Sequence, residues 1–269
     1  MAKIRIKKNP HSRAIGRRFE KLVDIMFTLR SEGGCPWDRS QSLRDLKQYL
    51  LEEAYELLEA LDLERNDMMR EELGDLLLQV VFQSQIMQER KTFTLLEVID
   101  ELINKLIGRH PHVFGDTKAG TPEEALESWE SRKGKEKETR NQKRTVLQGV
   151  PLNLPALLQA NIISSKVARV GFDWEKEEDV WKKLEEELDE FRDARTKRDR
   201  EEELGDVLFT LVNIARKHKI NPEDALRLAN AKFRKRFNKL EERVHSEDKN
   251  MKQMNLNELD QIWNEIKKK

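Results

Sequence analysis

The feature of this sequence that most restricts its fold is an internal repeat. The segment EELGDLLLQVV, which starts at Glu71, returns as EELGDVLFTLV from Glu202. The loop GCPWD from Gly34 has a counterpart in GFDW from Gly171, and an acidic segment follows the loop in both copies. Recurrence of several motifs in the same order indicates that one structural unit occurs twice. We therefore expect two related domains in the 269 residues.

Composition predicts that both domains are all-α. The chain has only 11 Gly and 7 Pro, and helix-favouring Leu, Glu, Lys and Arg are abundant. Apolar residues recur at helical spacing, and the spacing predicts helices over 42–61, 68–89 and 94–109. The expected organisation is a basic N-terminal extension over 1–18, a helical domain over 19–130, a charged linker over 131–150 and a second helical domain over 151–269.

Charge and cysteine content exclude several classes of protein. The 51 basic residues balance 51 acidic ones, which argues against attraction to nucleic acid or anionic membranes. The single cysteine, Cys35, excludes a disulfide framework and a cysteine-based zinc site. No apolar run reaches the roughly 18 residues of a membrane span. We expect a cytoplasmic protein that binds neither membrane nor nucleic acid.

Each copy of the repeat carries two acidic pairs of the form E-x-x-E and E-x-x-D. Residues three apart lie on one face of a helix. Within each copy the pairs are symmetric about one point, residue 64 in the first and a point between 196 and 197 in the second. An antiparallel hairpin that turns there would bring four carboxylates together. The first set is Glu53, Glu56, Glu72 and Asp75, and the second is Glu187, Glu190, Glu203 and Asp206.

Four converging carboxylates repel one another unless a cation neutralises them. Their hard oxygens suit magnesium, calcium or manganese, and magnesium typically bridges to substrate phosphates. Basic residues one or two helices later, Lys105 and Arg109 or the segment 232–236, could bind such phosphates. The pattern favours metal-assisted attack of water on a polyphosphate.

Acids on a single helix are more often a solvated face than a metal site. Two observations favour the site: the acids recur with matching surroundings, and the second helix of each pair is mostly apolar.

The motifs together resemble the MazG family of nucleoside triphosphate pyrophosphohydrolases, within the all-α NTP pyrophosphatase superfamily. The resemblance extends from about Phe19 to Lys267 and includes GCPWD, both acidic sets, RHPHVF from Arg109, VGFDW from Val170 and KFRKRF from Lys232. It implies two tandem MazG-like helical domains whose four-helix bundles are completed by dimerisation, hence a homodimer. It also implies hydrolysis of a nucleoside triphosphate between its α and β phosphates, with Mg²⁺ or substitute Mn²⁺, to clear non-canonical or surplus nucleotides.

Matching positions assign roles by the same resemblance. Both acidic sets match metal-binding and catalytic positions. The substrate-binding positions are Glu186, Lys232, Arg234, Lys235, Arg236 and Trp263, with Lys105 and Arg109 in the first half. The first half departs from the pattern at Gly108, where relatives carry a basic residue, and has no obvious counterpart of Trp263. We therefore expect the C-terminal site to be the better formed one.

Other functions stay open at the level of the sequence. One is a non-enzymatic helical scaffold or regulatory interaction protein that binds a partner through the charged linker. Another is a di-iron or di-manganese bundle, which requires Glu-x-x-His on two helices, whereas only Glu242 with His245 fits. Asn213 could contact a base or ribose, or be an interior polar residue. The spacing of His110 and His112 is more typical of a helix end than of a metal site.

Overall fold

The computed structural model describes residues 6–138 and 145–267. The chain divides into two compact units, and the described residues are 6–138 of the first unit and 145–267 of the second. In the described residues all secondary structure is helical, with no strand, so the all-α prediction is confirmed. The division falls within the charged segment 131–150. Each unit is described by itself below.

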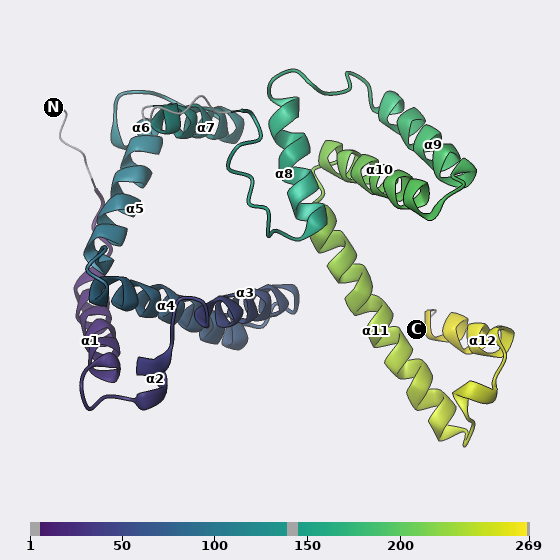
Figure 1. Cartoon of the computed structure of the whole chain (residues 1–269), viewed down its shortest axis with the longest axis horizontal. Coiled ribbons are helices and arrows are strands. Elements are labelled where there is room, and N and C mark those ends of the chain that lie inside the picture. The colour runs from purple at the N-terminus through teal and green to yellow at the C-terminus, as the bar shows by residue number, and fades with distance from the viewer. Residues whose placement is uncertain (1–5, 139–144, 268–269) are drawn as a thin grey trace. The chain divides into compact units, whose positions relative to one another are not determined.

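The first unit is built around the hairpin of α3 and α4, which lie antiparallel (Figure 1). Helix α1 packs on α4, and α5 leads from α4 towards α6 and α7. The bounds are α1 (Ser12–Arg30), α2 (Pro36–Ser40), α3 (Leu46–Asp62), α4 (Asn66–Glu89), α5 (Leu95–Arg109), α6 (Pro111–Phe114) and α7 (Pro122–Glu138).

The C-terminal half of α4 forms the core of this unit. Val81, Phe82 and Ile86 pack with Met26 of α1 and Leu46 of α3, and each of the five side chains is at most 3% exposed. The mostly apolar sequence of α4 predicts a helix buried over much of its circumference, but one face differs. Leu73, Leu77 and Val80, which extend from the N-terminal half to just past the middle of α4, are exposed.

Some element boundaries differ from the expected organisation. Helix α1 begins at Ser12, so residues 12–18 of the expected basic extension are helical. Helix α7 ends at Glu138, inside the expected linker, and residues 139–144 lie outside the described residues. Helix α5 ends at Arg109 because Pro111 lacks the N–H that would continue the helix.

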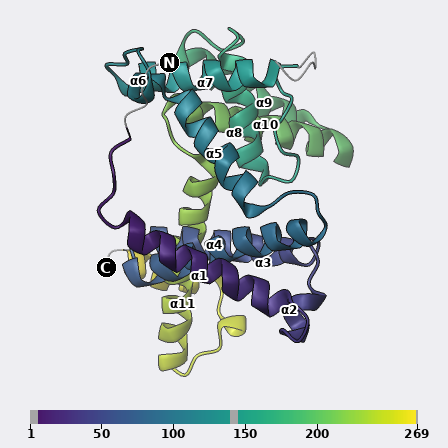
Figure 2. The same ribbon diagram turned by 90° about the vertical axis from the view of Figure 1, so that its left-hand side faces the viewer.

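The second unit has a corresponding hairpin, α9 with α10. Its core contains Val180, Leu184, Val207 and Ile214. Helix α11 leads away from the hairpin (Figures 1 and 2), and α12 folds back on α11 (Figure 1). The bounds are α8 (Ala156–Ala168), α9 (Glu177–Asp193), α10 (Lys197–Lys217), α11 (Pro222–Ser246), the 3₁₀ helix η1 (Met251–Gln253) and α12 (Leu256–Lys267).

The GFDW loop is fastened to the end of α10 through Asp173. Its carboxylate accepts hydrogen bonds from both terminal nitrogens of Arg216, at 2.5 and 3.1 Å. Lys217 Nζ donates to the carbonyl oxygen of Trp174 at 2.7 Å, and Trp174 packs on the core. The Arg216 guanidinium holds the pKa of Asp173 below its ordinary value. The repeated loop motif therefore has a structural role in this unit.

We expect Asp173→Asn to lower the free energy of unfolding by about 1–3 kcal/mol at pH 7, because a charge-assisted pair is lost. Since the folded-state pKa of Asp173 is depressed, its contribution is present above the unfolded pKa of about 3.9 and disappears as pH falls below that value. Denaturant unfolding followed by circular dichroism measures the difference. The control, Asp179→Asn, removes an exposed pair with Lys182 and should cost less than about 1 kcal/mol. An equal loss of unfolding free energy in both variants would show that the Asp173–Arg216 pair stabilises the fold no more than an exposed ion pair does.

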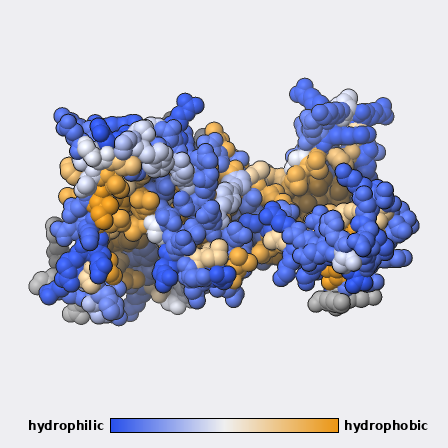
Figure 3. Space-filling view, turned by 90° about the horizontal axis from the view of Figure 1, so that it is seen from below, coloured by the Kyte–Doolittle hydropathy of each residue, from blue (hydrophilic) through white to orange (hydrophobic). Residues whose placement is uncertain are grey.

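Hydrophobic residues also lie at the surface (Figure 3). In α10 the exposed residues Leu204, Leu208 and Leu211 share one face, and they occupy the same repeat positions as the exposed face of α4. Both hairpins thus leave an apolar face uncovered within their own unit. Among the helices of the described ranges, none combines the length and hydropathy needed to cross a membrane.

Candidate active site

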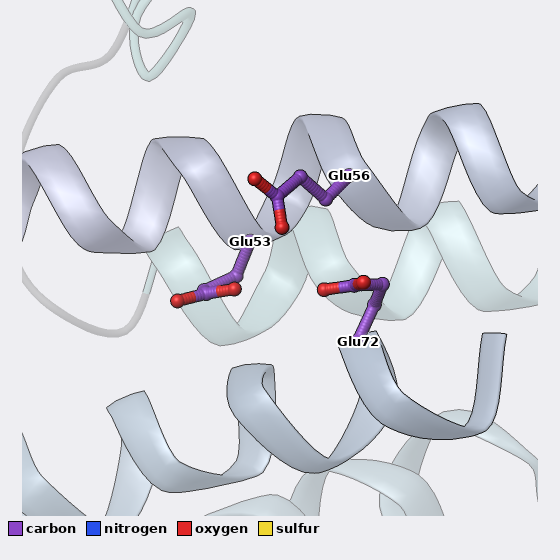
Figure 4. A group of neighbouring side chains, drawn as sticks. All are labelled: Glu53, Glu56 and Glu72. Atoms are coloured by element: carbon purple, nitrogen blue, oxygen red, sulfur yellow. The ribbon is translucent and has the colours of Figure 1, made fainter. Parts of the chain in front are cut away.

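The α3–α4 hairpin brings three acidic side chains together. Glu53 and Glu56 project from α3 towards Glu72 of α4, and the three carboxylates face one another between the helices (Figure 4). One oxygen of each lies within 4.8 Å of the others. The meeting follows from the hairpin turn and from the three-residue spacing on α3.

Electrostatic strain in this group is evident from pKa shifts. Burial raises the pKa of Glu53, as does the nearby charge of Asp75, the fourth predicted acid, although Asp75 lies outside the group of three. Burial and the neighbouring carboxylates also raise the pKa of Glu72. Glu72 is 7% exposed, and its Oε2 is buried without a hydrogen-bond partner. A buried oxygen without a hydrogen bond lowers the stability of the fold unless a ligand or ion binds it.

The α9–α10 hairpin repeats this arrangement. Glu187 and Glu190 of α9 meet Glu203 of α10, again with one oxygen of each within 4.8 Å of the others. Burial raises the pKa of Glu203, and the charges of Glu190 and Asp206 add to the shift. Asp206 lies outside the group of three, as Asp75 does in the first unit.

A lysine distinguishes the second group from the first. Glu187 is only 5% exposed, and its carboxylate pairs with Lys183 Nζ at 2.8 Å. Lys183 also contacts Glu186 at 2.6 Å. The corresponding position in the first unit is Tyr49, which packs against the core. The sequence comparison of the two copies misses Lys183 because it occurs in only one of them. Its position four residues before Glu187 is the signal that could have revealed it.

Both groups fit a divalent cation such as Mg²⁺. They contain only carboxylate oxygens, the hard ligands this ion prefers. The unpartnered Glu72 Oε2 and the raised pKa values show that each group holds more negative charge than its surroundings neutralise. An ion would be held by the three glutamates of each hairpin, with Asp75 or Asp206 beside them.

In the second unit the predicted phosphate-binding cations lie on another helix than the carboxylates. Lys232, Arg234 and Lys235 are exposed on α11, which leads away from the α9–α10 hairpin (Figure 1). Within one copy the basic segment therefore lies apart from the carboxylates. Trp263 of α12 contacts Phe233 of α11, with ring centroids 5.1 Å apart.

In the first unit both predicted cations are engaged. Lys105 pairs with Glu101 at 2.9 Å. The guanidinium of Arg109 lies over the ring of Trp129, 5.2 Å from its centroid.

Comparison with known proteins assigns both hairpins to one family. The model of the MazG nucleotide pyrophosphohydrolase domain matches residues 41–114 and 175–240, and each stretch contains one complete acidic set. The chain belongs to the MazG family.

Relatives of this MazG chain match along nearly its whole length. The nucleoside triphosphate pyrophosphohydrolase/pyrophosphatase MazG of Thermotoga maritima is 47% identical over 94% of this chain and 96% of its own length. The nucleoside triphosphate pyrophosphohydrolase of Escherichia coli K12 is 40% identical over 93% of this chain and 97% of its own. An uncharacterized Bacillus subtilis protein, YabN, is 42% identical over 93% of this chain but 51% of its own length.

A glycine lies among the acids of each MazG hairpin. Gly74 and Gly205 occupy helix interiors, where glycine costs about 1 kcal/mol relative to alanine. A Cβ added at either position would meet no described atom within 4 Å. The open space lies where a substrate or another helix could approach closely.

Two further polar residues have structural roles in the MazG units. Asn213 is 2% exposed, donates to the carbonyl of Phe209 and accepts from Arg216, which makes it an interior polar residue. His110 Nδ1 donates to the carbonyl of Leu106 at 2.7 Å at the end of α5.

Proposed function

We propose that this chain is a nucleoside triphosphate pyrophosphohydrolase that cleaves between the α and β phosphates and releases a monophosphate and pyrophosphate. The observation that carries the proposal is the pair of carboxylate groups, each inside a stretch matched by the MazG domain model. The names of the Thermotoga maritima and Escherichia coli relatives, both of which cover nearly the whole chain, support it.

In this proposal Glu187, Glu190, Glu203 and Asp206 hold Mg²⁺, or Mn²⁺ as a substitute, and the first set does so in its own hairpin. The bound ion would neutralise charge on the phosphates as a Lewis acid. A carboxylate of the group orients a water molecule and accepts its proton while the water oxygen bonds to the α phosphorus. The bond between the α phosphorus and the bridging oxygen breaks, and pyrophosphate leaves.

We assign the main substrate contacts to the second unit. Lys232, Arg234, Lys235 and Arg236 bind the phosphates, Glu186 lines the site and Trp263 contacts the base. Lys183, which already touches Glu187, adds a cation beside the ion site. Lys105 and Arg109 are the corresponding cations of the first unit.

A homodimer would complete the bundles and bring the basic segments to the carboxylates. The exposed apolar faces of α4 and α10 support this assembly, since an isolated hairpin leaves them in water. Light scattering should give about twice the chain mass of 31.8 kDa. A single-chain mass would contradict the assembly.

The physiological role we propose is removal of non-canonical or surplus nucleotides. Nucleotide pools of this kind are cytoplasmic, which is the location the proposal implies.

The test measures pyrophosphate release from canonical, deoxy and oxidised nucleoside triphosphates with Mg²⁺ and with EDTA. We expect release from at least one nucleotide with Mg²⁺ and none with EDTA. In ¹⁸O water the label should enter the monophosphate, because the water attacks the α phosphorus. Label in pyrophosphate would contradict the site of attack. Absence of metal-dependent release from every nucleotide would leave the helical scaffold as the better explanation.

A further inference from the structure

Helices α7 and α12 are counterparts in the two units, although their sequences are largely different. Each begins with a similar cap. The side chain of Thr121 accepts a hydrogen bond from the N–H of Glu124, and that of Asn255 accepts one from the N–H of Glu258, at 3.2 and 3.1 Å. In α12 the Glu258 carboxylate accepts the N–H of Asn255 itself, which makes the cap reciprocal. In α7 the Glu124 carboxylate accepts the N–H of Gly120, the residue before Thr121, so the two caps are similar but not identical.

The caps place two tryptophans in the same register. Trp129 follows the first residue of α7, Pro122, by seven positions, and Trp263 follows Leu256 of α12 by seven. Trp129 follows Arg109 by 20 positions and Trp263 follows Arg236 by 27, so the connection before the tryptophan helix is seven residues longer in the second copy. The equal distance from the helix start makes Trp129 the counterpart of Trp263.

The two tryptophan helices also have the same neighbours. Helix α7 packs on α5 and α12 packs on α11, and α5 and α11 are the helices that carry the basic residues. The ring partners differ: Trp263 contacts Phe233, whereas Trp129 contacts the guanidinium of Arg109. Arg109 occupies the repeat position of Arg236. An aromatic ring and a cation are therefore in direct contact in the first unit.

This pair has the chemistry to recognise a nucleotide. The indole of Trp129 is half-buried and has one face towards the guanidinium. A nucleobase is flat and stacks on an indole, and a guanidinium binds phosphate through several N–H groups. Contact between Arg109 and Trp129 holds both groups on adjoining helices at the same level.

We propose that the first unit has its own nucleotide-binding element, in which Trp129 stacks on the base of a nucleoside triphosphate and Arg109 contacts its phosphates. The proposal rests on the proposed function and extends it to a half of the chain for which the sequence offers no base contact. It makes the first unit a second binding site for nucleotides. The competing explanation is that Trp129 only anchors α7 to α5.

The test uses the full chain with the second site disabled by Glu187→Gln, Glu190→Gln, Glu203→Gln, Asp206→Asn and Trp263→Leu. Calorimetry with Mg²⁺ measures the Kd of α,β-methylene ATP, which resists cleavage, and of inorganic tripolyphosphate, which has no base. In this background Trp129→Leu should raise the Kd of the ATP analogue about tenfold, because one base stack is worth roughly 1.4 kcal/mol. Trp129→Phe keeps an aromatic face and should change it less than about threefold. The Kd of tripolyphosphate should not change in either variant.

Leu126→Ala, at an exposed position of the same helix, is the matched control and should leave both Kd values unchanged. Leucine retains an apolar anchor, so circular dichroism should be unchanged in Trp129→Leu. An equal loss of affinity for tripolyphosphate would show that Trp129 acts only as an anchor and would overturn the proposal. So would an unchanged Kd for the ATP analogue, or no binding of it in the disabled background. These failures are distinct from failure of the proposed function, which is absence of pyrophosphate release by the unmodified chain.

Discussion

Replacing the four acids of the second hairpin by amides should lower kcat/KM for pyrophosphate release by at least about 10³-fold. The change, Glu187→Gln with Glu190→Gln, Glu203→Gln and Asp206→Asn, keeps side-chain shape but removes the charge that would hold the ion. A factor of 10³ corresponds to about 4 kcal/mol of transition-state stabilisation, within what a bound ion contributes. The same change in the first hairpin should cost less than about tenfold. Initial rates with saturating Mg²⁺ measure both effects.

The ranking of the two hairpins follows from their surroundings. Lys183 lies at the second carboxylate group, and Lys232, Arg234 and Lys235 are exposed. In the first unit Lys105 pairs with Glu101, and Tyr49 occupies the repeat position of Lys183. If the substitutions in the first hairpin abolish turnover and those in the second leave it intact, the ranking is wrong. Asp189→Asn is the control, since this acid lies on α9 but is exposed and pairs with Arg192. It should leave the rate unchanged.

Mg²⁺ should raise the melting temperature of the unmodified chain by about 5–10 °C for each hairpin that binds it, at an ion concentration 100 times its Kd. Binding to the folded state alone then contributes about 2.7 kcal/mol, and each kcal/mol moves the midpoint of a chain of this size by about 2–4 °C. The ion would relieve the repulsion that raises the pKa values of Glu53, Glu72, Glu190 and Glu203. Melting followed by circular dichroism with Mg²⁺ or EDTA measures the shift.

The increase in melting temperature caused by Mg²⁺ should depend on pH. The folded-state pKa values of these glutamates lie above their unfolded values, so the folded state binds more protons. Their contribution to stability in EDTA is most favourable below about pH 4.3 and is lost as pH rises through the raised values. Mg²⁺ competes with those protons, so its stabilisation should be larger at pH 7.5 than at pH 5. A chain with all eight acids replaced by amides should show no such dependence. An equal Mg²⁺ shift in that variant would contradict binding at the hairpins.

The acidic hairpins are the part of the site that the sequence predicts best. A turn near residue 64 follows from the symmetric spacing of the acids, and the structure places Glu53 and Glu56 against Glu72 there. The spacing of residues in two consecutive helices is a local property, so it can be inferred from a single sequence. The spacing did not show that Asp75 lies outside the group of three, because the position of each carboxylate also depends on its side-chain conformation.

What the sequence could not predict depends on contacts between distant elements or on differences between the copies. Trp129 was missed because α7 and α12 share a similar cap and a tryptophan but little else, and because α6 separates α7 from α5 along the chain. Lys183 was missed because a repeat reveals only what both copies share. The exposed face of α4 was missed because apolar periodicity shows that a face will be covered but not by which molecule.

Gly74 and Gly205 weaken their helices by about 1 kcal/mol each, and nothing in the described chain requires a glycine at either position. Alanine would fit both places and would make each hairpin more rigid. The same glycine in two diverged copies leaves the surface of α4 and of α10 without a side chain beside the acidic group, so the backbone of each helix is accessible at the level of the acids.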